Sequence, residues 1–456
     1  MMKKTTCILC VFCTLLALSG CSGDAEPKES GSSAADSQTT SAEKKDETST
    51  AETTTLTTSD TQSSTDETTT IPALQETESP LLHLNQHHLY QAEWSEEYDV
   101  AMAELECLTV QLDETDARQY PALAETLSGV ADMMEVNMLE TYDMLLESAG
   151  ETLSSGAKNF HMYVTSLDAQ VRRADKVVLS VRNESYQYDE YSEGITRIWG
   201  GTYDTETGTE LFLPDIVTDL DAFSKAVKEE LSLRVGADVF YSENSIENYF
   251  RDYGADGTNW TLEYNGMTVY FDAGDIATLD NGAMEVFIGF AEYPQLFKKK
   301  YTTVPESYIV RLSLETPLFT DLDGDGTADE LIVWDSYEND NNVNATLHIS
   351  NPETYYSEGI WAYGCVPYCV KTADGKHYVY LFAEQGTQLY LYVYAVTNET
   401  ISKVGEANLS PYYKDGISAI LTDPARMHFD VFGDGAGGGV PQRNDFFAVG
   451  EDGMPK

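Results

Sequence analysis

The fold class is decided by the stretch Trp260-Thr261-Leu262-Glu263-Tyr264-Asn265-Gly266-Met267-Thr268-Val269-Tyr270-Phe271. Its two halves, 260–264 and 267–271, alternate in hydrophobicity and are joined by Asn265-Gly266. Asn-Gly between two such runs is a strong hairpin signal, because both residues tolerate the positive φ angles of a tight turn. Residues 176–188, 210–213, 284–290 and 308–314 predict further strands. We therefore expect a mainly antiparallel sheet within residues 81–312.

Helical patterns flank this hairpin region on its N-terminal side. One pattern begins at Tyr120-Pro121 and ends at Gly150, since proline suits a first helical turn and glycine suits a helix end. A second runs over residues 219–235 and is followed by Gly236. Their apolar residues recur at close to helical spacing: Leu123, Leu127, Val130, Met134, Met138 and Leu145 in the first, Leu220, Phe223, Val227 and Leu231 in the second. The pattern predicts an α+β domain with helices packed on the sheet.

The order of motifs in this region resembles a known family. Its motifs are Tyr120-Pro121-Ala122-Leu123, Tyr203-Asp204-Thr205-Glu206-Thr207-Gly208, Glu210-Leu211-Phe212-Leu213-Pro214-Asp215-Ile216-Val217 and Val269-Tyr270-Phe271-Asp272. Residues 95–312 thus resemble the extracellular domain of unknown function shared by the lysozyme-sensing anti-sigma factor RsiV and the peptidoglycan deacetylase PdaC. The resemblance implies an envelope-facing recognition domain without catalytic activity.

The densest chemical signal is the segment 320–330, Thr-Asp-Leu-Asp-Gly-Asp-Gly-Thr-Ala-Asp-Glu. Asp321, Asp323, Asp325 and Asp329 occupy loop positions 1, 3, 5 and 9, and the Thr327 carbonyl occupies position 7. Hard oxygen donors at this spacing favour Ca²⁺ in a structural role, because close carboxylates repel unless a cation lies among them. Strand-like flanks make the loop similar to the calcium loops of integrin-type β-propeller repeats. The alternative is an Asp-Gly turn without metal.

Residues 313–456 predict an all-β C-terminal domain, either a sandwich or a propeller-like sheet. Residues 377–382 and 389–396 alternate strictly, which places Tyr390, Tyr392 and Tyr394 on one face. Such a row either stacks against sugar rings or covers a sheet through cross-strand pairs. Further strands are expected at 344–350, 428–432 and 446–449. Cys365 and Cys369 either form a disulfide across a three-residue turn or are two small buried residues.

The N-terminus predicts a lipoprotein. Lys3 and Lys4 precede an apolar run over 7–18, and Leu18-Ser19-Gly20-Cys21 resembles a bacterial lipobox. We expect residues 1–20 to be a signal peptide and Cys21 to carry the lipid. Residues 21–80 predict a disordered tether, because 26 of residues 22–80 are Ser or Thr and none is aromatic. The expected location is the extracellular face of a bacterial membrane, in particular that of a Gram-positive cell.

The composition limits the classes of partner that the protein can bind. The chain of 456 residues carries 77 Asp and Glu against 27 Lys and Arg, a formal net charge of −50. Such charge repels phosphate, which excludes nucleic acid, and attracts cations. Since no catalytic motif appears, we expect a binding protein for an envelope or host ligand, either a cationic protein such as a lysozyme or a cell-wall glycan. The alternatives are an envelope glycan hydrolase or deacetylase and a structural wall spacer.

Overall fold

The computed structural model describes residues 80–157, 159–190, 194–339, 342–350, 352–362, 364–385, 388–409, 417–429 and 446–456. The predicted signal peptide, Cys21 and all but the last residue of the predicted tether lie outside these residues. Residues 74–456 form one compact unit, which is described below.

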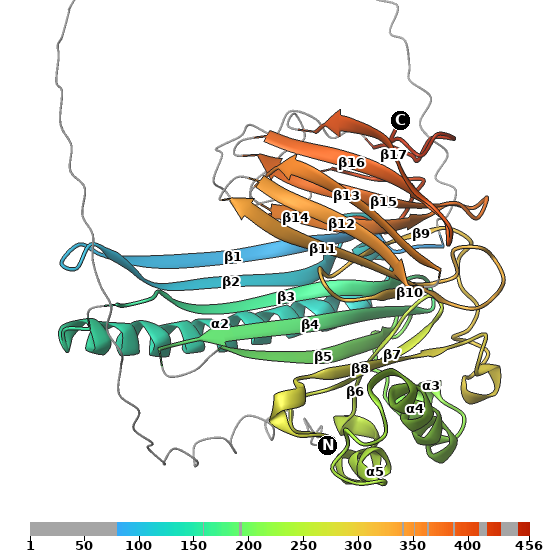
Figure 1. The fold of residues 1–456 in the computed structure, drawn as a ribbon, viewed down its shortest axis with the longest axis horizontal. Coiled ribbons are helices and arrows are strands. Elements are labelled where there is room, and N and C mark those ends of the chain that lie inside the picture. The colour runs from blue at the N-terminus through green and yellow to red at the C-terminus, as the bar shows by residue number, and fades with distance from the viewer. Residues whose placement is uncertain are drawn as a thin grey trace, which may run out of the picture. The chain divides into compact units, whose positions relative to one another are not determined.

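The largest sheet has six strands in the order β18-β1-β2-β3-β4-β5 (Figure 1). Their bounds are β1 Leu84–Ser95, β2 Val100–Leu112, β3 Tyr163–Ala174, β4 Val178–Tyr188, β5 Ile195–Asp204 and β18 Ile417–Ile420. Neighbouring strands are antiparallel except β2 and β3, which run parallel. Parallel neighbours need a long crossover. Here α1 (Glu114–Gln119) and α2 (Pro121–Ser154) supply it.

Helix α2 confirms the first predicted helix and lies along the six-stranded sheet (Figure 1). Pro121 occupies its first turn, and the helix continues past Gly150 to Ser154. The predicted apolar face packs on the sheet in two cores, one around Leu123 and Leu127 and one around Met138 and Leu145. Burying each such side chain contributes about 1.5–3 kcal/mol. Packing on the sheet, rather than intrinsic propensity, therefore stabilises this helix.

The predicted hairpin is confirmed in a second, three-stranded antiparallel sheet. This part comprises β6 Asn259–Leu262, β7 Gly266–Phe271, β8 Met284–Gly289, α3 Leu213–Ile216, α4 Leu220–Val235, α5 Ser245–Gly257 and two short 3₁₀ turns, η1 Leu279–Asn281 and η2 Pro294–Leu296. Helix α4 confirms the second predicted helix, and Phe223 of α4 shares a core with Val269 of β7. The strand expected over 210–213 is wrong. Only a single bridge joins Glu210 to Tyr203, and α3 begins at Leu213 because Pro214 suits a first helical turn.

The C-terminal region is all-β, as predicted. One sheet has the order β10-β11-β12-β13 and the other β17-β16-β15-β14-β9. Their bounds are β9 Tyr308–Arg311, β10 Leu318–Thr320, β11 Asp329–Asn339, β12 Asn342–Ser350, β13 Glu353–Trp361, β14 Gly364–Lys371, β15 His377–Gln385, β16 Gln388–Val396 and β17 Ile401–Asn408. Val333 and Leu347 of the first sheet share a core with Val379 and Leu381 of the second. Two sheets that share one core form a β-sandwich, so the sandwich interpretation is the right one.

Strand β16 shows what the tyrosine row does. Tyr394 is fully buried in the core between the two sheets, and its hydroxyl donates to Glu358 Oε2 at 3.0 Å. Leu391 and Val393 lie on the opposite face, in a second core closed by Phe429 and Phe447 from the end of the chain. Tyr394 is therefore unavailable to a sugar ring. The predicted strand 446–449 forms only isolated bridges. Of the predicted strand 428–432, residues 430–432 lie outside the described residues.

The disulfide alternative is wrong. Cys365 and Cys369 are free and buried, and both lie on the extended strand β14, where no turn is present. Four residues of strand span about 13 Å, far beyond the Cα separation that a disulfide allows. Pro367 fits within this strand because β9 pairs with β14 only from Tyr368 onward.

Several contacts join residues on the two sides of position 312. Strand β18 pairs with β1, β9 pairs with β14, and the Arg311 guanidinium lies 2.9 Å from Asp168. In addition, His83 Nδ1 lies 3.1 Å from Asp116 Oδ2, and its Nε2 lies 3.5 Å from Asp423 Oδ2. The limits 81–312 and 313–456 stay predictions, but the chain's last third clearly returns to the first sheet.

Candidate functional site

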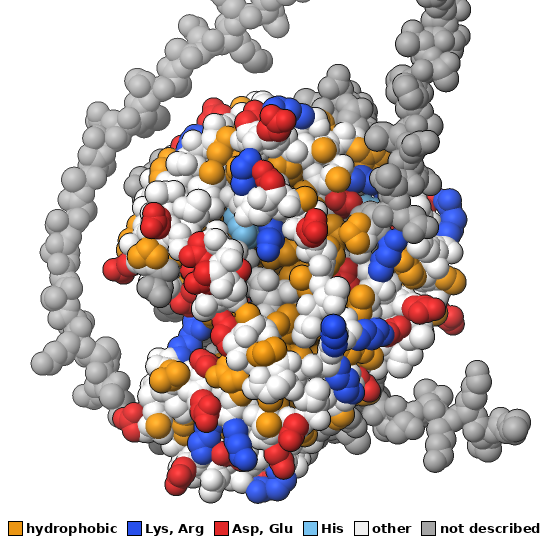
Figure 2. Space-filling view, turned by 90° about the vertical axis from the view of Figure 1, so that its right-hand side faces the viewer, with side chains coloured by type: hydrophobic (Ala, Val, Ile, Leu, Met, Phe, Trp, Pro, Cys, Tyr) orange, Lys and Arg blue, Asp and Glu red, His pale blue; other side chains and the backbone are white. Residues whose placement is uncertain are grey.

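The N-terminal part of the compact unit carries a concentrated negative charge. Residues 81–157 contain sixteen Asp and Glu but only one Lys or Arg, Arg118. This segment forms β1, β2, α1 and α2. Strands β1 and β2 are neighbours in the six-stranded sheet, and α2 packs on one face of that sheet (Figure 1). We call the exposed parts of these four elements the acidic surface. It extends over both sides of the sheet, because Ala103, Leu105 and Cys107 of β2 pack against α2, and Glu104 and Glu106 therefore point to the opposite side. The face drawn in Figure 2, which is the right-hand side of Figure 1 and lies away from the β1–β2 turn, instead mixes Lys and Arg with Asp and Glu.

Large apolar side chains are exposed among these acids. Tyr90 (53 % exposed) and Trp94 (57 %) lie on β1, Tyr98 lies in the β1–β2 turn, and Met144 (63 %) lies on α2. The end of β1 is exposed on both faces of the strand. Exposed apolar residues scattered singly are ordinary. Tyr90 lies on the same face as Glu104, to which its hydroxyl donates, whereas α2 with Met144 packs on the opposite face, so these side chains do not form a single patch.

Two histidines on β1 each contact a carboxylate of the acidic surface. His87 Nδ1 lies 2.9 Å from Glu135 Oε1 of α2, and His88 Nε2 lies 3.2 Å from Glu106 Oε1 of β2. His83 contacts a third carboxylate, Asp116. Because each ring contacts a different carboxylate, these histidines do not converge on a single metal position.

The predicted calcium loop joins β10 to β11. Three of its predicted ligands, Asp321, Asp323 and Asp325, bring carboxylate oxygens within 4.8 Å of one another. The loop is shaped by its own amides: Gly324 N and Gly326 N donate to Asp321, and Thr327 N donates to Asp325 Oδ1. Gly324 and Gly326 have positive φ, which glycine adopts without strain.

Asp329, the fourth predicted carboxylate, is placed differently. Its Oδ2 accepts a hydrogen bond from Leu322 N at 2.8 Å, which closes the loop. Partial burial and the charges of Asp323, Asp321 and Asp325 raise its pKa. The Asp329 carboxylate thus interacts electrostatically with the other three carboxylates, although it is not part of the 4.8 Å cluster.

The donor set fits a hard divalent cation. Two oxygens that bind one Ca²⁺ at about 2.3–2.6 Å lie at most about 5 Å apart, and 4.8 Å is within this limit. Two side chains from outside the loop also reach it: Asn398 Nδ2 donates to Asp323 Oδ2 at 2.5 Å, and Glu292 Oε1 accepts from Ala328 N at 3.2 Å. The loop is therefore held between the sandwich and the turn after β8.

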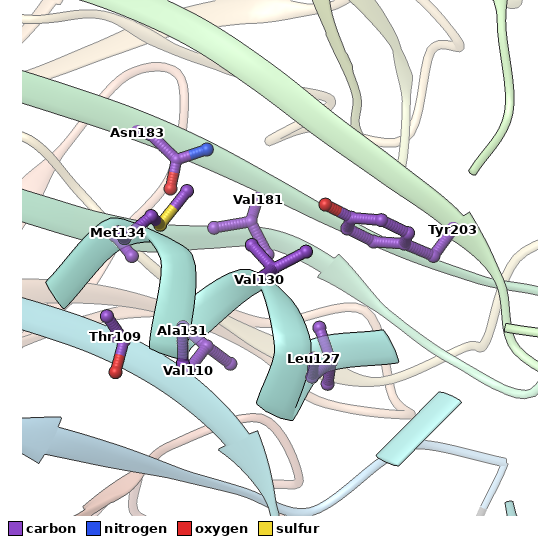
Figure 3. Close-up of a pocket in the computed structure, with 10 residues that line it drawn as sticks. Thr109, Val110, Leu127, Val130, Ala131, Met134, Val181, Asn183 and Tyr203 are labelled. Carbon is purple, nitrogen blue, oxygen red and sulfur yellow. The ribbon is translucent and has the colours of Figure 1, made fainter. Parts of the chain in front are cut away.

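A small pocket lies beneath α2 (Figure 3). Its volume is about 320 Å³, counting the space open to solvent. Leu127, Val130 and Met134 of α2 line one side, and Val181 of β4 lines the other. The hydroxyl of Tyr203 points into it, and burial raises the pKa of this phenol. Thr109 Oγ1 is buried there and has no hydrogen-bond partner among the described residues.

No protein-family model matches the sequence, and no curated protein matches it. Two solved structures resemble parts of the chain. One, from Bacteroides fragilis, is 16 % identical and covers 48 % of this chain and 94 % of its own, with a TM-score of 0.35. The other, from Pseudomonas aeruginosa, is 15 % identical and covers 48 % and 96 %, with a TM-score of 0.32. Both are DUF3298 family proteins.

Among the residues that the structure describes, no helix has both the length and the apolar character that crossing a bilayer requires. The predicted lipidation site, Cys21, is outside them.

The acidic surface was not predicted as such. The net charge of the whole chain does not show where the acids are concentrated. Counting acidic and basic residues segment by segment would have found this surface, because its acids all come from residues 81–157.

Proposed function

We propose that this protein is a lipid-anchored, non-catalytic protein on the outer face of a bacterial membrane, and that its acidic surface binds a cationic ligand. The observation that carries the proposal is the ratio of sixteen acids to one base over residues 81–157. A surface of one sign speeds the association of an oppositely charged partner and disfavours partners of the same sign. The resemblance to the RsiV and PdaC domain supports a cationic envelope or host protein, with a lysozyme as the favoured class.

The exposed apolar residues can add binding free energy that exposed charges alone do not supply. Exposed ion pairs contribute little, about 0–1 kcal/mol each. Aromatic side chains at the centre of an interface contribute more, about 2 kcal/mol or above. Trp94 of β1 and Met144 of α2 are exposed beside the acids. We expect them to be the contacts that hold the partner after charge has attracted it.

The test measures binding of the full chain to lysozyme by calorimetry at low and at high salt. A triple variant, Glu140→Gln, Asp143→Asn and Glu147→Gln, removes three exposed charges from α2. At about 0.5 kcal/mol each, it should weaken binding about tenfold. The matched control, Asp238→Asn, Glu243→Gln and Asp280→Asn, removes three exposed charges elsewhere and should leave the affinity nearly unchanged. Failure to bind lysozyme at low salt would exclude this partner.

We also propose that the loop formed by Asp321, Asp323, Asp325, Thr327 and Asp329 binds Ca²⁺ in a structural role. The oxygen-only donor set and the 4.8 Å spacing support this proposal. Because the loop contacts Glu292 and Asn398, the ion would stiffen the connection between the turn after β8 and the sandwich.

Two alternatives make different predictions. A glycan-processing enzyme needs two carboxylates facing a cleft that holds the sugar, and purified protein would then release reducing ends or acetate from peptidoglycan. A wall spacer would bind no soluble ligand at all, so any saturable titration would exclude it.

A further inference from the structure

The two outer faces of the sandwich differ. The outer face of the sheet β17-β16-β15-β14-β9 is covered, because Leu391 and Phe382 pack against Phe429 and Phe447 from the end of the chain. On the other sheet, β13 has the burial pattern of a strand with one open face: Glu353, Tyr355, Ser357, Gly359 and Trp361 are exposed, and the residues between them are not. The described residues therefore leave this face of β13 open to solvent.

The open face of β13 has two aromatic rings with small residues between them. Tyr355 and Trp361 are each 53 % exposed, and Ser357 and Gly359 lie between them on the same face. Six residues of strand separate the two rings, a distance of about 20 Å. Tyr355 stacks on His348 with ring centroids 4.3 Å apart, and Trp334 lies edge-on to Tyr355 at 6.2 Å. The two rings thus stand at the ends of a row of small exposed residues on β13, and we call this row, with the neighbouring residues of β12, the trough.

The floor of the trough is polar but uncharged. Strand pairing places Thr346 beside Ser357, with their hydroxyls 2.8 Å apart, and Asn344 beside Gly359. The residues of the central rows include no Asp, Glu, Lys or Arg: Ile332, Trp334, Ser336, Asn344, Thr346, His348, Tyr355, Ser357, Gly359 and Trp361. Glu330 and Glu353 lie at one end of these rows. In a chain with 77 acids, an uncharged face of this extent favours an uncharged ligand.

Gly359 is the second, independent observation. A Cβ at this position would meet no heavy atom within 4 Å, so packing does not require glycine here. Its φ is not in the left-handed region either. Glycine inside a strand costs stability and often marks a place where a ligand approaches the backbone closely. The empty space above Gly359 lies between the two exposed rings.

We propose that this trough binds an uncharged oligosaccharide of pyranose units, which lies along β13 from Tyr355 to Trp361. The C–H groups on one face of a pyranose ring pack on the electron-rich face of an aromatic ring. The sugar's hydroxyl and amide groups can exchange hydrogen bonds with Ser357, Thr346 and Asn344. A span of about 20 Å exceeds one sugar ring, so the ligand is a chain of several units, as in an envelope glycan. This site is separate from the acidic surface.

The test uses the full chain on an array of uncharged oligosaccharides of four or more hexose or N-acetylhexosamine units, followed by titration with the N-acetylglucosamine tetramer and the glucose tetramer. Binding of at least one such glycan is expected. Trp361→Ala and Gly359→Gln should each weaken it at least tenfold, and Trp361→Phe should retain most of it. Unchanged melting temperatures would show that the variants are folded. Trp94→Ala removes an equally exposed tryptophan from the acidic surface and should leave glycan binding unchanged.

Three results would overturn the proposal. The first is binding to none of the uncharged glycans on the array. The second is glycan binding that Trp361→Ala and Gly359→Gln leave intact. The third is a dimer in size-exclusion chromatography that Trp361→Ala converts to monomer, since the face would then be covered by a second copy of the chain.

Discussion

His83 should make the stability of this protein depend on pH in the neutral to alkaline range. Burial alone would lower the pKa of its ring, but hydrogen bonds to Asp116 and Asp423, with the charge of Asp116, raise it to about 9 from 6.5. The folded state thus binds the proton more tightly than the unfolded state. The resulting stabilisation is complete below pH 6.5 and is lost as the pH rises through 9. A difference of about 2.5 pKa units corresponds to about 3 kcal/mol.

The assay is urea unfolding of the protein and of the variant His83→Gln at intervals from pH 6 to pH 9. Between these limits the protein should lose about 3 kcal/mol more unfolding free energy than the variant. The comparison with the variant is needed because other groups titrate too. His377, for example, works in the opposite direction, since burial and the charge of Lys371 lower its pKa to about 4 and it therefore favours folding at higher pH.

The exposed His161 supplies the matched control, because His161→Gln also replaces one imidazole by an amide but leaves His83 and its two carboxylates in place. Asp423→Asn removes one of the two partners of His83 and should flatten the pH dependence in part. Parallel curves for the protein and His83→Gln across the whole range would refute the reasoning, because the ring would then carry no folding-linked proton.

Three further predictions follow from buried or clustered groups. Arg173→Met should lower the free energy of unfolding by about 3–5 kcal/mol, which urea unfolding measures. The variant leaves Asp175 buried without its guanidinium partner at 2.8 Å and removes the hydrogen bond to the Tyr301 carbonyl. Removing Ca²⁺ with a chelator should lower the melting temperature by several degrees. The double variant Asp323→Asn, Asp325→Asn should abolish this effect of the chelator. An equal melting temperature with and without chelator would count against a structural ion. The thiols of Cys365 and Cys369 should resist alkylation at pH 8 until the protein unfolds, since burial raises the pKa of each to about 12, and mass spectrometry of native against urea-treated samples checks this.

Local signals predicted local structure well. The hairpin at Asn265-Gly266, the helix that begins at Pro121 and the Asp loop at 321–329 all depend on residues close together in the sequence. Each was found because its apolar period or residue spacing is set by a single element. The α+β class followed directly from these elements.

The strands β1 and β3 were missed for two different physical reasons. The second half of β1 is exposed on both faces, so neither face requires apolar residues and the period-2 pattern is absent. Strand β3 contains Arg172 and Arg173, which resemble surface residues in sequence but are buried against Glu263 and Asp175. Arg172 pairs with Glu263, which is 91 residues further along the chain, and Arg173 bonds the distant Tyr301 carbonyl as well as the nearby Asp175. A local sequence pattern cannot predict these distant contacts. The trough on β13 was missed likewise, because three strands assemble it.

The distribution of cationic residues explains why the acidic surface is so one-sided. Four of the arginines are buried or partly buried and are paired with carboxylates: Arg172 with Glu263, Arg173 with Asp175, Arg182 with Glu184 and Arg311 with Asp168. Removing one partner from such a pair is costly, so these arginines cannot turn outward to neutralise the surface. Strands β3 and β4, which carry three of them, lie beside β2 in the same sheet. The fold therefore holds these four arginines in internal pairs, and among the described residues the acids of β1, β2 and α2 have histidines, not Lys or Arg, as their ion-pair partners.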